Sequence, residues 1–145
     1  MTTFTIYPKE GGKDFKADLG GFEIADDGQI ILQNTIAKKS DLAMLVTDTV
    51  AAIIPEQIQP DKWGESENQI TYLVYLKDRT EEPIKIYAGA FDVIDSLVQF
   101  FWLVERAPGY EREPLPIRQI YVPVSEIVGI FPEGGLVTRR WHLEK

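Results

Sequence analysis

The sequence contains no cysteine, which excludes disulfide bonds, thiolate nucleophiles and every metal site built from cysteine. It has a single histidine, His142, so a catalytic triad or a histidine-based zinc site would depend on that one residue. We expect His142 to be an exposed strand residue. No run approaches about 18 apolar residues, and no signal-peptide pattern opens the chain. These absences favour a cytoplasmic protein without membrane contact.

Motifs that would indicate a chemistry are also missing. The glycine doublets match neither a phosphate-binding loop nor a dinucleotide fingerprint, and there is no nucleophile elbow. Four carboxylate pairs have simpler explanations as a hairpin turn, two solvated loops and a helix start: Asp26/Asp27, Glu65/Glu67, Glu81/Glu82 and Asp92/Asp95. We therefore predict no catalytic residues, no metal site and no cofactor.

The negative charge is concentrated in the middle of the chain. The formal charge is −8, and residues 41–105 hold twelve acids against four bases. This balance disfavours direct nucleic-acid binding, which depends on clustered Lys and Arg. It favours partners with a basic surface, mainly by raising the rate of association.

Apolar residues make up 44% of the sequence, which is ordinary for a globular protein, and the length suits one domain over residues 1–145. About eight strands are predicted from β-prone runs and turn signals. Their ranges are 4–8, 22–25, 29–35, 70–76, 84–88, 117–123, 126–131 and 136–143. Asp27-Gly28 predicts a hairpin with a type I′ turn between the second and third strands.

Two regions need closer interpretation. Residues 41–54 fit either a helix or two strands broken at Thr47-Asp48, and the density of Val, Ile and Thr leads us to favour strands. In 70–76 the apolar residues alternate, but the second face, with Thr71, Leu73 and Tyr75, is itself half apolar. We expect this strand to be central and partly covered on both sides.

One principal helix is predicted near 92–106. Asp92 and Asp95 have the spacing of a helix cap and a first-turn acid, and Pro108-Gly109 would end the helix. A wide apolar stripe follows the helical period: Val93, Ile94, Leu97, Val98, Phe101 and Val104. The predicted fold class is therefore α+β, with a mainly antiparallel sheet that could close into a barrel and one buried helix.

Several aromatic residues are candidates for binding. Trp102 would fall on the polar side of the helix, as an interface anchor or as core covered by another element. Trp63 and Tyr110 lie in loops beside acids, where they could bind a partner or pack onto the core. Residues 139–141, Arg-Arg-Trp, could stack on a nucleobase, but a charged edge strand explains them better.

We interpret the protein as a non-catalytic, acidic protein-interaction module, such as an inhibitor, an immunity protein or a phage-encoded blocker, that covers a basic surface of its partner. The predicted partner-binding residues are Asp61, Trp63, Glu65, Glu67, Asp78, Glu81, Glu82, Trp102 and Tyr110. One alternative is a structural or assembly subunit, including a homo-oligomer built by edge strands. A second alternative is a small-ligand binder or a carboxylate-dependent enzyme.

Overall fold

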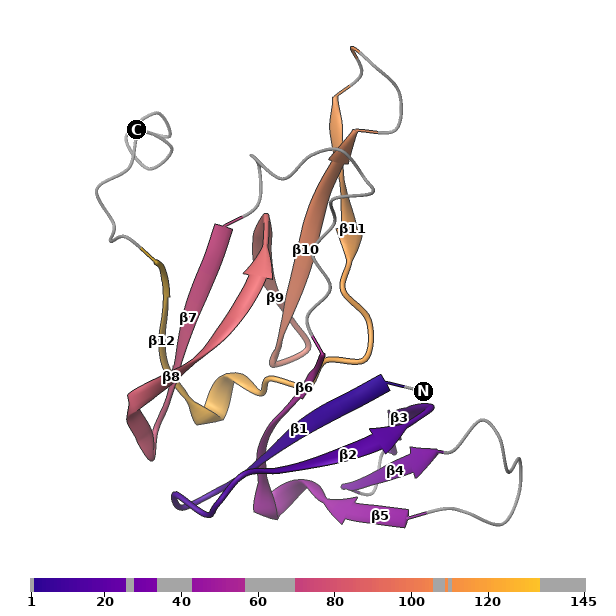
Figure 1. Ribbon diagram of the computed structural model, residues 1–145, viewed down its shortest axis with the longest axis vertical. Helices are drawn as coiled ribbons and strands as arrows, with labels where there is room; N and C mark the ends of the chain where they lie inside the picture. The colour runs from indigo at the N-terminus through magenta and orange to yellow at the C-terminus, as the bar shows by residue number, and fades with distance from the viewer. Residues whose placement is uncertain are drawn as a thin grey trace.

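A computed structural model of the chain describes residues 2–25, 28–33, 43–56, 70–105, 109 and 111–133. The described strands form four three-stranded sheets, and every pairing within them is antiparallel. In chain order the elements are β1 (Thr2–Pro8), β2 (Phe15–Leu19), β3 (Gly21–Ile24), β4 (Gln29–Gln33), β5 (Ala43–Val46), η1 (Thr47–Thr49), β6 (Val50–Pro55), β7 (Ile70–Leu76), β8 (Arg79–Ala88), β9 (Ala90–Ile94), β10 (Leu97–Glu105), β11 (Arg112–Pro116), η4 (Val124–Glu126) and β12 (Ile127–Pro132) (Figure 1).

The sheets are ordered β2-β1-β6, β3-β4-β5, β12-β7-β8 and β11-β10-β9. Each is open, so the barrel that the sequence suggested is not formed by the described strands. Within these residues the only helical elements are the two short 3₁₀ turns η1 and η4. The prediction of an α+β fold was therefore wrong, and the described chain is an antiparallel β protein. It contains no helix that is both long and apolar enough to cross a membrane.

The predicted helix near 92–106 is a β-hairpin. β9 and β10 pair from Leu97↔Ile94 onward, and Asp95 and Ser96 form the turn between them. Both turn residues have positive φ, 53° and 65°, as in the type I′ turn whose twist suits a two-residue hairpin. The apolar residues of β10 that point inward alternate along the strand and include Val98, Phe100 and Val104. That period of two, together with the β-branched and aromatic composition, outweighs the helical stripe.

The strands predicted within residues 22–54 are largely confirmed in the described part of that range. Within the predicted range 41–54, the described residues from Ala43 onward form β5 and β6, separated by η1 at Thr47–Thr49. This confirms the interpretation as two strands with a break at Thr47-Asp48. β3 and β4 form the predicted hairpin, and Gly28 has a φ of 85°. The Ala25 amide bonds the Gln29 carbonyl, so three residues rather than two connect the paired positions. This differs from the expected type I′ turn.

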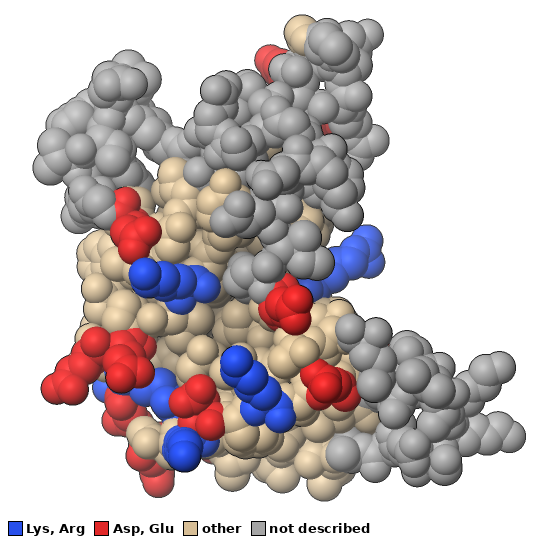
Figure 2. Space-filling view, in the orientation of Figure 1, with Lys and Arg blue, Asp and Glu red and all other residues tan. Residues whose placement is uncertain are grey.

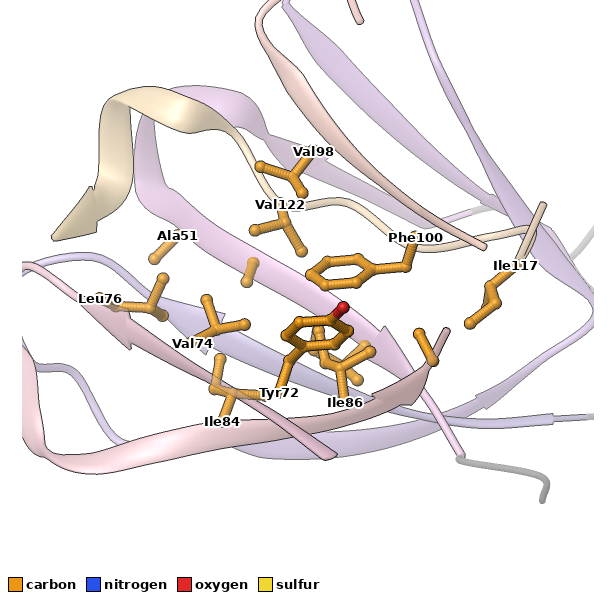
Figure 3. Close-up of a cluster of buried hydrophobic side chains, with 13 residues drawn as sticks. Ala51, Tyr72, Val74, Leu76, Ile84, Ile86, Val98, Phe100, Ile117 and Val122 are labelled. Atoms are coloured by element: carbon orange, nitrogen blue, oxygen red, sulfur yellow. The ribbon is translucent and has the colours of Figure 1, made fainter. Parts of the chain in front are cut away.

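Two buried clusters meet at β6, all of whose residues before Pro55 are buried. The larger cluster packs β7 and β8 against β6, β10 and residues 117–122, with Tyr72 and Phe100 near its centre (Figure 3). The smaller cluster joins β1 and β6 to the β3–β4 hairpin. Ala52 and Ile54 of β6 belong to the larger cluster, whereas Val50 and Ile53 belong to the smaller one. β6 is therefore the wall shared by both cores.

Residues 117–124, which we call the joining segment, bind three sheets together. The sequence predicted a strand over 117–123, but the segment makes only isolated bridges. Tyr121 and Ile53 exchange both backbone hydrogen bonds at 2.9 Å. The Val98 amide donates to the Val122 carbonyl at 2.8 Å, which attaches the segment to β10. The segment satisfies backbone groups of β6 and β10 that would otherwise be buried without partners.

Gln119 extends this joining to a third sheet. Its φ is 61°, and its Oε1 accepts a hydrogen bond from the backbone amide of Phe22 in β3 at 2.6 Å. A Cβ atom built on Gly21 would lie 2.6 Å from that same Oε1. Only glycine at position 21 allows the amide group of Gln119 to approach this closely.

The hairpin assignment predicts that Ser96→Gly stabilises the protein by about 0.5–1 kcal/mol, because glycine adopts a positive φ without the steric cost of a side chain. Ser125→Gly is the matched control, since Ser125 has no positive φ and should gain nothing. Urea denaturation measures both variants. In a helix, Ser96→Gly would instead cost several tenths of a kcal/mol, so a loss of stability would contradict the hairpin.

The contact between Gly21 and Gln119 predicts that Gly21→Ala destabilises the fold by about 1–3 kcal/mol, because the buried Phe22 amide loses its acceptor. In a Gln119→Gly background the side-chain amide of Gln119 is gone, so the new methyl group at position 21 has nothing to displace. There Gly21→Ala should lower the free energy of unfolding much less. Urea denaturation of the parent, the two single variants and the double variant gives the coupling free energy between the two positions. Additive effects would show that the two residues do not act on each other.

Candidate protein-binding surface

The sheet β12-β7-β8 has two faces of different character. Register places Tyr72, Val74 and Leu76 on the face that enters the larger core. The opposite face, which we call the outer face, carries Thr71, Leu73 and Tyr75 from β7, Lys85 and Tyr87 from β8, and Gly129 and Phe131 from β12. An antiparallel sheet facing water usually has a polar outer side. Here the outer face is mainly aromatic and aliphatic, with Thr71 and Lys85 as its polar residues, and its side chains are partly or largely exposed.

Aromatic packing gives this face a fixed shape. The rings of Tyr75 and Phe131 meet edge to face, with centroids 5.9 Å apart and an interplanar angle of 72°. The Phe131 ring lies over Gly129, where a Cβ atom would come within 2.7 Å of it. Lys85 and Glu133 form an ion pair at 3.3 Å, so the charges on this face neutralise each other. The centre of the face is thus apolar, with Phe131 41% exposed.

Acidic side chains gather at one end of the same sheet. Asp78, Glu81 and Glu82 are exposed at and just after the turn between β7 and β8, beside Lys77; we call these four residues the acidic tip. The sequence predicted strands over 70–76 and 84–88, but β8 already begins at Arg79, so the turn between the two strands is shorter than expected. Figure 2 shows the acidic atoms, mixed with a few basic ones, at the lower left, where Figure 1 places this turn.

Arg79 fixes the acidic tip to the rest of the fold. Its Nη2 donates to the carbonyl of Pro8 at 3.1 Å and to the carbonyl of Gly12, and the guanidinium lies 5.3 Å from the centre of the Tyr7 ring. Asp14 lies 4.0 Å from Nη1. The charge of Arg79 is therefore directed at the turn between β1 and β2. The tip itself presents three acids and one base to solvent.

Trp102 lies elsewhere, on β10 and not on a helix. It is half-buried, packs against the larger core, and donates from Nε1 to the carbonyl of Tyr87 at 3.2 Å. It lines a groove of about 370 Å³ together with Phe4, Pro55, Leu115 and Ile117. The polar lining residues include Glu56 and Arg118. The volume is within the range of small-ligand sites.

The groove and the acidic tip are at opposite ends of β1. Thr2 and Phe4, at the start of the strand, line the groove, whereas Pro8, at its end, binds Arg79. Six residue steps along a strand cover about 20 Å. Trp102 and the acids Asp78, Glu81 and Glu82, which the sequence grouped as one set of partner-binding residues, therefore occupy two separate surfaces.

The other predicted binding residues, Asp61, Trp63, Glu65, Glu67 and Tyr110, lie outside the described residues, as do His142 and the Arg-Arg-Trp run at 139–141. Asp92 and Asp95 are described, but Asp92 lies on β9 and Asp95 lies in the hairpin turn, so neither starts a helix. Asp92 Oδ1 accepts a hydrogen bond from the Val93 amide at 2.8 Å.

Sequence reasoning missed the outer face as a binding surface. The signal was present in the apolar second side of 70–76, which we interpreted as partly covered. What the sequence could not provide was the register that adds Phe131 of β12 to the same face as Leu73 and Tyr75. Among the described residues, no three or more His, Cys, Asp or Glu side chains gather in a way that could hold a metal ion.

Two tyrosines have raised pKa values. Burial is the main cause of the raised pKa of Tyr7, and the carboxylate of Asp14 adds to it while Arg79 opposes it. Burial also raises the pKa of Tyr121, and Glu126 and Asp48 add to the effect. Both phenols are therefore held in the neutral form more firmly than in the unfolded chain.

Comparisons with protein-family models, with curated proteins and with solved structures found no match to this chain.

The raised pKa of Tyr7 predicts a loss of stability at alkaline pH. The folded state holds the Tyr7 phenol proton more tightly than the unfolded state does. Tyr7 therefore contributes its full stabilisation below the ordinary pKa of 10.0, and this stabilisation is lost as pH rises through the raised pKa. Tyr7→Phe should therefore lose less free energy of unfolding than the parent between pH 9 and pH 11, a window of about one unit either side of the ordinary tyrosine pKa. Urea denaturation across this range measures the difference. Tyr75→Phe is the control, and equal pH slopes for the parent and Tyr7→Phe would contradict the assignment.

Proposed function

We propose that the protein is a non-catalytic interaction module that binds a basic surface of a partner protein and covers it. The observation that carries the proposal is the apolar outer face of β12-β7-β8, with the acidic tip at one end of it. An exposed apolar patch with a polar rim is typical of protein-binding sites. The outer face would supply the buried centre of the interface, and the acidic tip would supply part of its rim.

Aromatic residues give the centre its affinity. Tyr75 and Phe131 have few rotatable bonds and support each other edge to face, so little side-chain entropy is lost when they are buried. The ion pair between Lys85 and Glu133 is exposed at 3.3 Å and contributes little to stability. A partner that buries Phe131 in a pocket would find a surface that is already ordered.

The acidic tip gives the module its preference for basic partners. The tip has three acids, Asp78, Glu81 and Glu82, against one base, Lys77. Arg79 does not offset this charge at the tip, because its guanidinium binds the β1–β2 turn. Charges at the rim of an interface act mainly on the rate of association and on its salt dependence. The proposed mechanism is occlusion, in which the bound sheet blocks access to Lys and Arg side chains that meet the acidic tip and that the partner needs for its own function.

The groove beside Trp102 supports a second candidate function. Its walls are largely apolar, and Glu56 is the one carboxylate among its described lining residues. This arrangement suits the binding of a small apolar ligand better than two-carboxylate catalysis, which needs a second acid near the first.

The proposal predicts different kinetic effects for the two parts of the surface. A triple variant, Asp78→Asn, Glu81→Gln and Glu82→Gln, should slow association with a captured partner and flatten its salt dependence, because the rim charge is gone. Phe131→Ser should instead raise the dissociation rate by at least about tenfold, as expected for a central aromatic anchor. Surface plasmon resonance at two salt concentrations measures both rates for a partner identified by affinity capture and mass spectrometry.

A second triple variant controls for net charge. Glu23→Gln, Asp48→Asn and Glu111→Gln remove the same charge from exposed positions away from the tip. This variant should bind like the parent at high salt, and at low salt it should change less than the tip variant. If the tip variant, Phe131→Ser and the control all bind with the parent's rates, the partner does not use this surface.

A further inference from the structure

β12 is an edge strand with an unusual composition. It pairs with β7 on one side, and on its other side none of the described strands pairs with it (Figure 1). Its six residues, Ile-Val-Gly-Ile-Phe-Pro, include no charged side chain. Val128 is 61% exposed, which is the highest value among the large apolar residues of the described chain.

Two other edge strands of this protein, β2 and β11, carry features that disfavour edge-to-edge pairing, whereas the edge strand β5 has neither a charged residue nor a proline. β2 has Lys16 and Asp18, and β11 has Glu113 together with two prolines. Charged side chains and proline on an edge disfavour pairing with another chain. β12 has Pro132 at its last position and a register shift between Ile127 and Gly129, so the part of its edge that remains able to pair is centred on Ile130.

The backbone of β12 presents hydrogen-bonding groups on that edge. The Glu133 amide donates to the Thr71 carbonyl of β7 at 2.7 Å, and Phe131 is directly opposite Leu73. Because backbone groups alternate in direction along a strand, those of Ile130 point away from β7. Ile130 therefore offers both an amide and a carbonyl to an incoming strand.

In a chain with a net charge of −8, the two acids that flank β12 in the sequence are each paired with a lysine. Glu126, just before the strand, pairs with Lys9 at 3.4 Å, and Glu133, just after it, pairs with Lys85 at 3.3 Å. Neither flanking acid would therefore bring an unpaired negative charge to this edge when two copies meet along it.

We propose that β12 pairs antiparallel with β12 of a second copy of this chain. A two-fold axis perpendicular to the sheet relates the two copies, so the same edge is used on both. The two three-stranded sheets become one six-stranded sheet, and their outer faces lie on the same side. Val128 of each copy is buried at the junction. The dimer presents two acidic tips, so it would engage a repetitive basic partner with two sites at once.

The test uses the purified full chain alone. Sedimentation velocity across a concentration series should give a monomer–dimer equilibrium for the parent. Val128→Lys places a positive charge on the edge of each copy and should raise the dimer dissociation constant at least about tenfold. Val93→Lys is the matched control, because Val93 is 52% exposed on β9 and should leave the dissociation constant unchanged. Circular dichroism checks that both variants fold.

Hydrogen exchange identifies the edge that is used. The Ile130 amide should exchange more slowly as the concentration of the chain rises, since it is bonded only in the dimer. A parent that stays monomeric up to about 1 mM would overturn the proposal. So would a dimer whose Ile130 amide exchanges at a rate independent of concentration, or equal weakening by Val128→Lys and Val93→Lys. Binding of a basic partner is measured separately, with the captured partner present, whereas dimer formation is measured on this chain alone. Either proposal can therefore fail without the other.

Discussion

The paired backbone hydrogen bonds between Ile53 and Tyr121 are the interaction on which the rest of the structure depends. They attach the joining segment to β6, the wall between the two cores. From there the segment reaches β10 through Val122 and β3 through Gln119. Four small sheets would each bury little apolar surface alone. Joined at β6, the described sheets share two cores. This sharing is the physical reason to expect a single domain, which remains a prediction from the sequence.

This arrangement leaves one face of β12-β7-β8 outside both cores. β7 and β8 contribute Val74, Ile84 and Ile86 to the larger core, so the aromatic residues on their other side cannot also be buried there. Arg79 holds the turn at the end of this sheet against β1, which keeps the acidic tip in a fixed position. The surface proposed for binding is thus a consequence of how the cores are assembled, and it rests on strands instead of mobile loops.

Much of the strand pattern could be predicted from the sequence, because alternation is a local property. The buried alternation of β7 and β8 and the division of 41–54 into β5 and β6 were correct. The hairpin at Asp95 and Ser96 was missed because neither residue is glycine, and positive φ at both positions is rare without it. Helical and alternating periods overlapped in residues 92–104, and composition should have decided between them.

Long-range register could not be predicted. Nothing local places Phe131 beside Leu73, Gln119 against Gly21, or Tyr121 beside Ile53, since each pairing joins segments that lie far apart in the chain. For the same reason Trp102 and Glu82, both chosen from the sequence as binding residues, proved to lie on separate surfaces. Composition indicated which residue types could bind a partner, and only the topology showed which of them lie together.

Native-state hydrogen exchange of the Ile53 and Tyr121 amides tests the central claim most directly, because both amides donate within the joining bridge. If β6 and the joining segment hold the sheets in one cooperative unit, these amides exchange only on global unfolding, with the same opening free energy as the amides of the buried strand β7. An opening free energy several kcal/mol lower than that of β7 would mean that the two cores separate before the protein unfolds, and it would contradict this account of the fold.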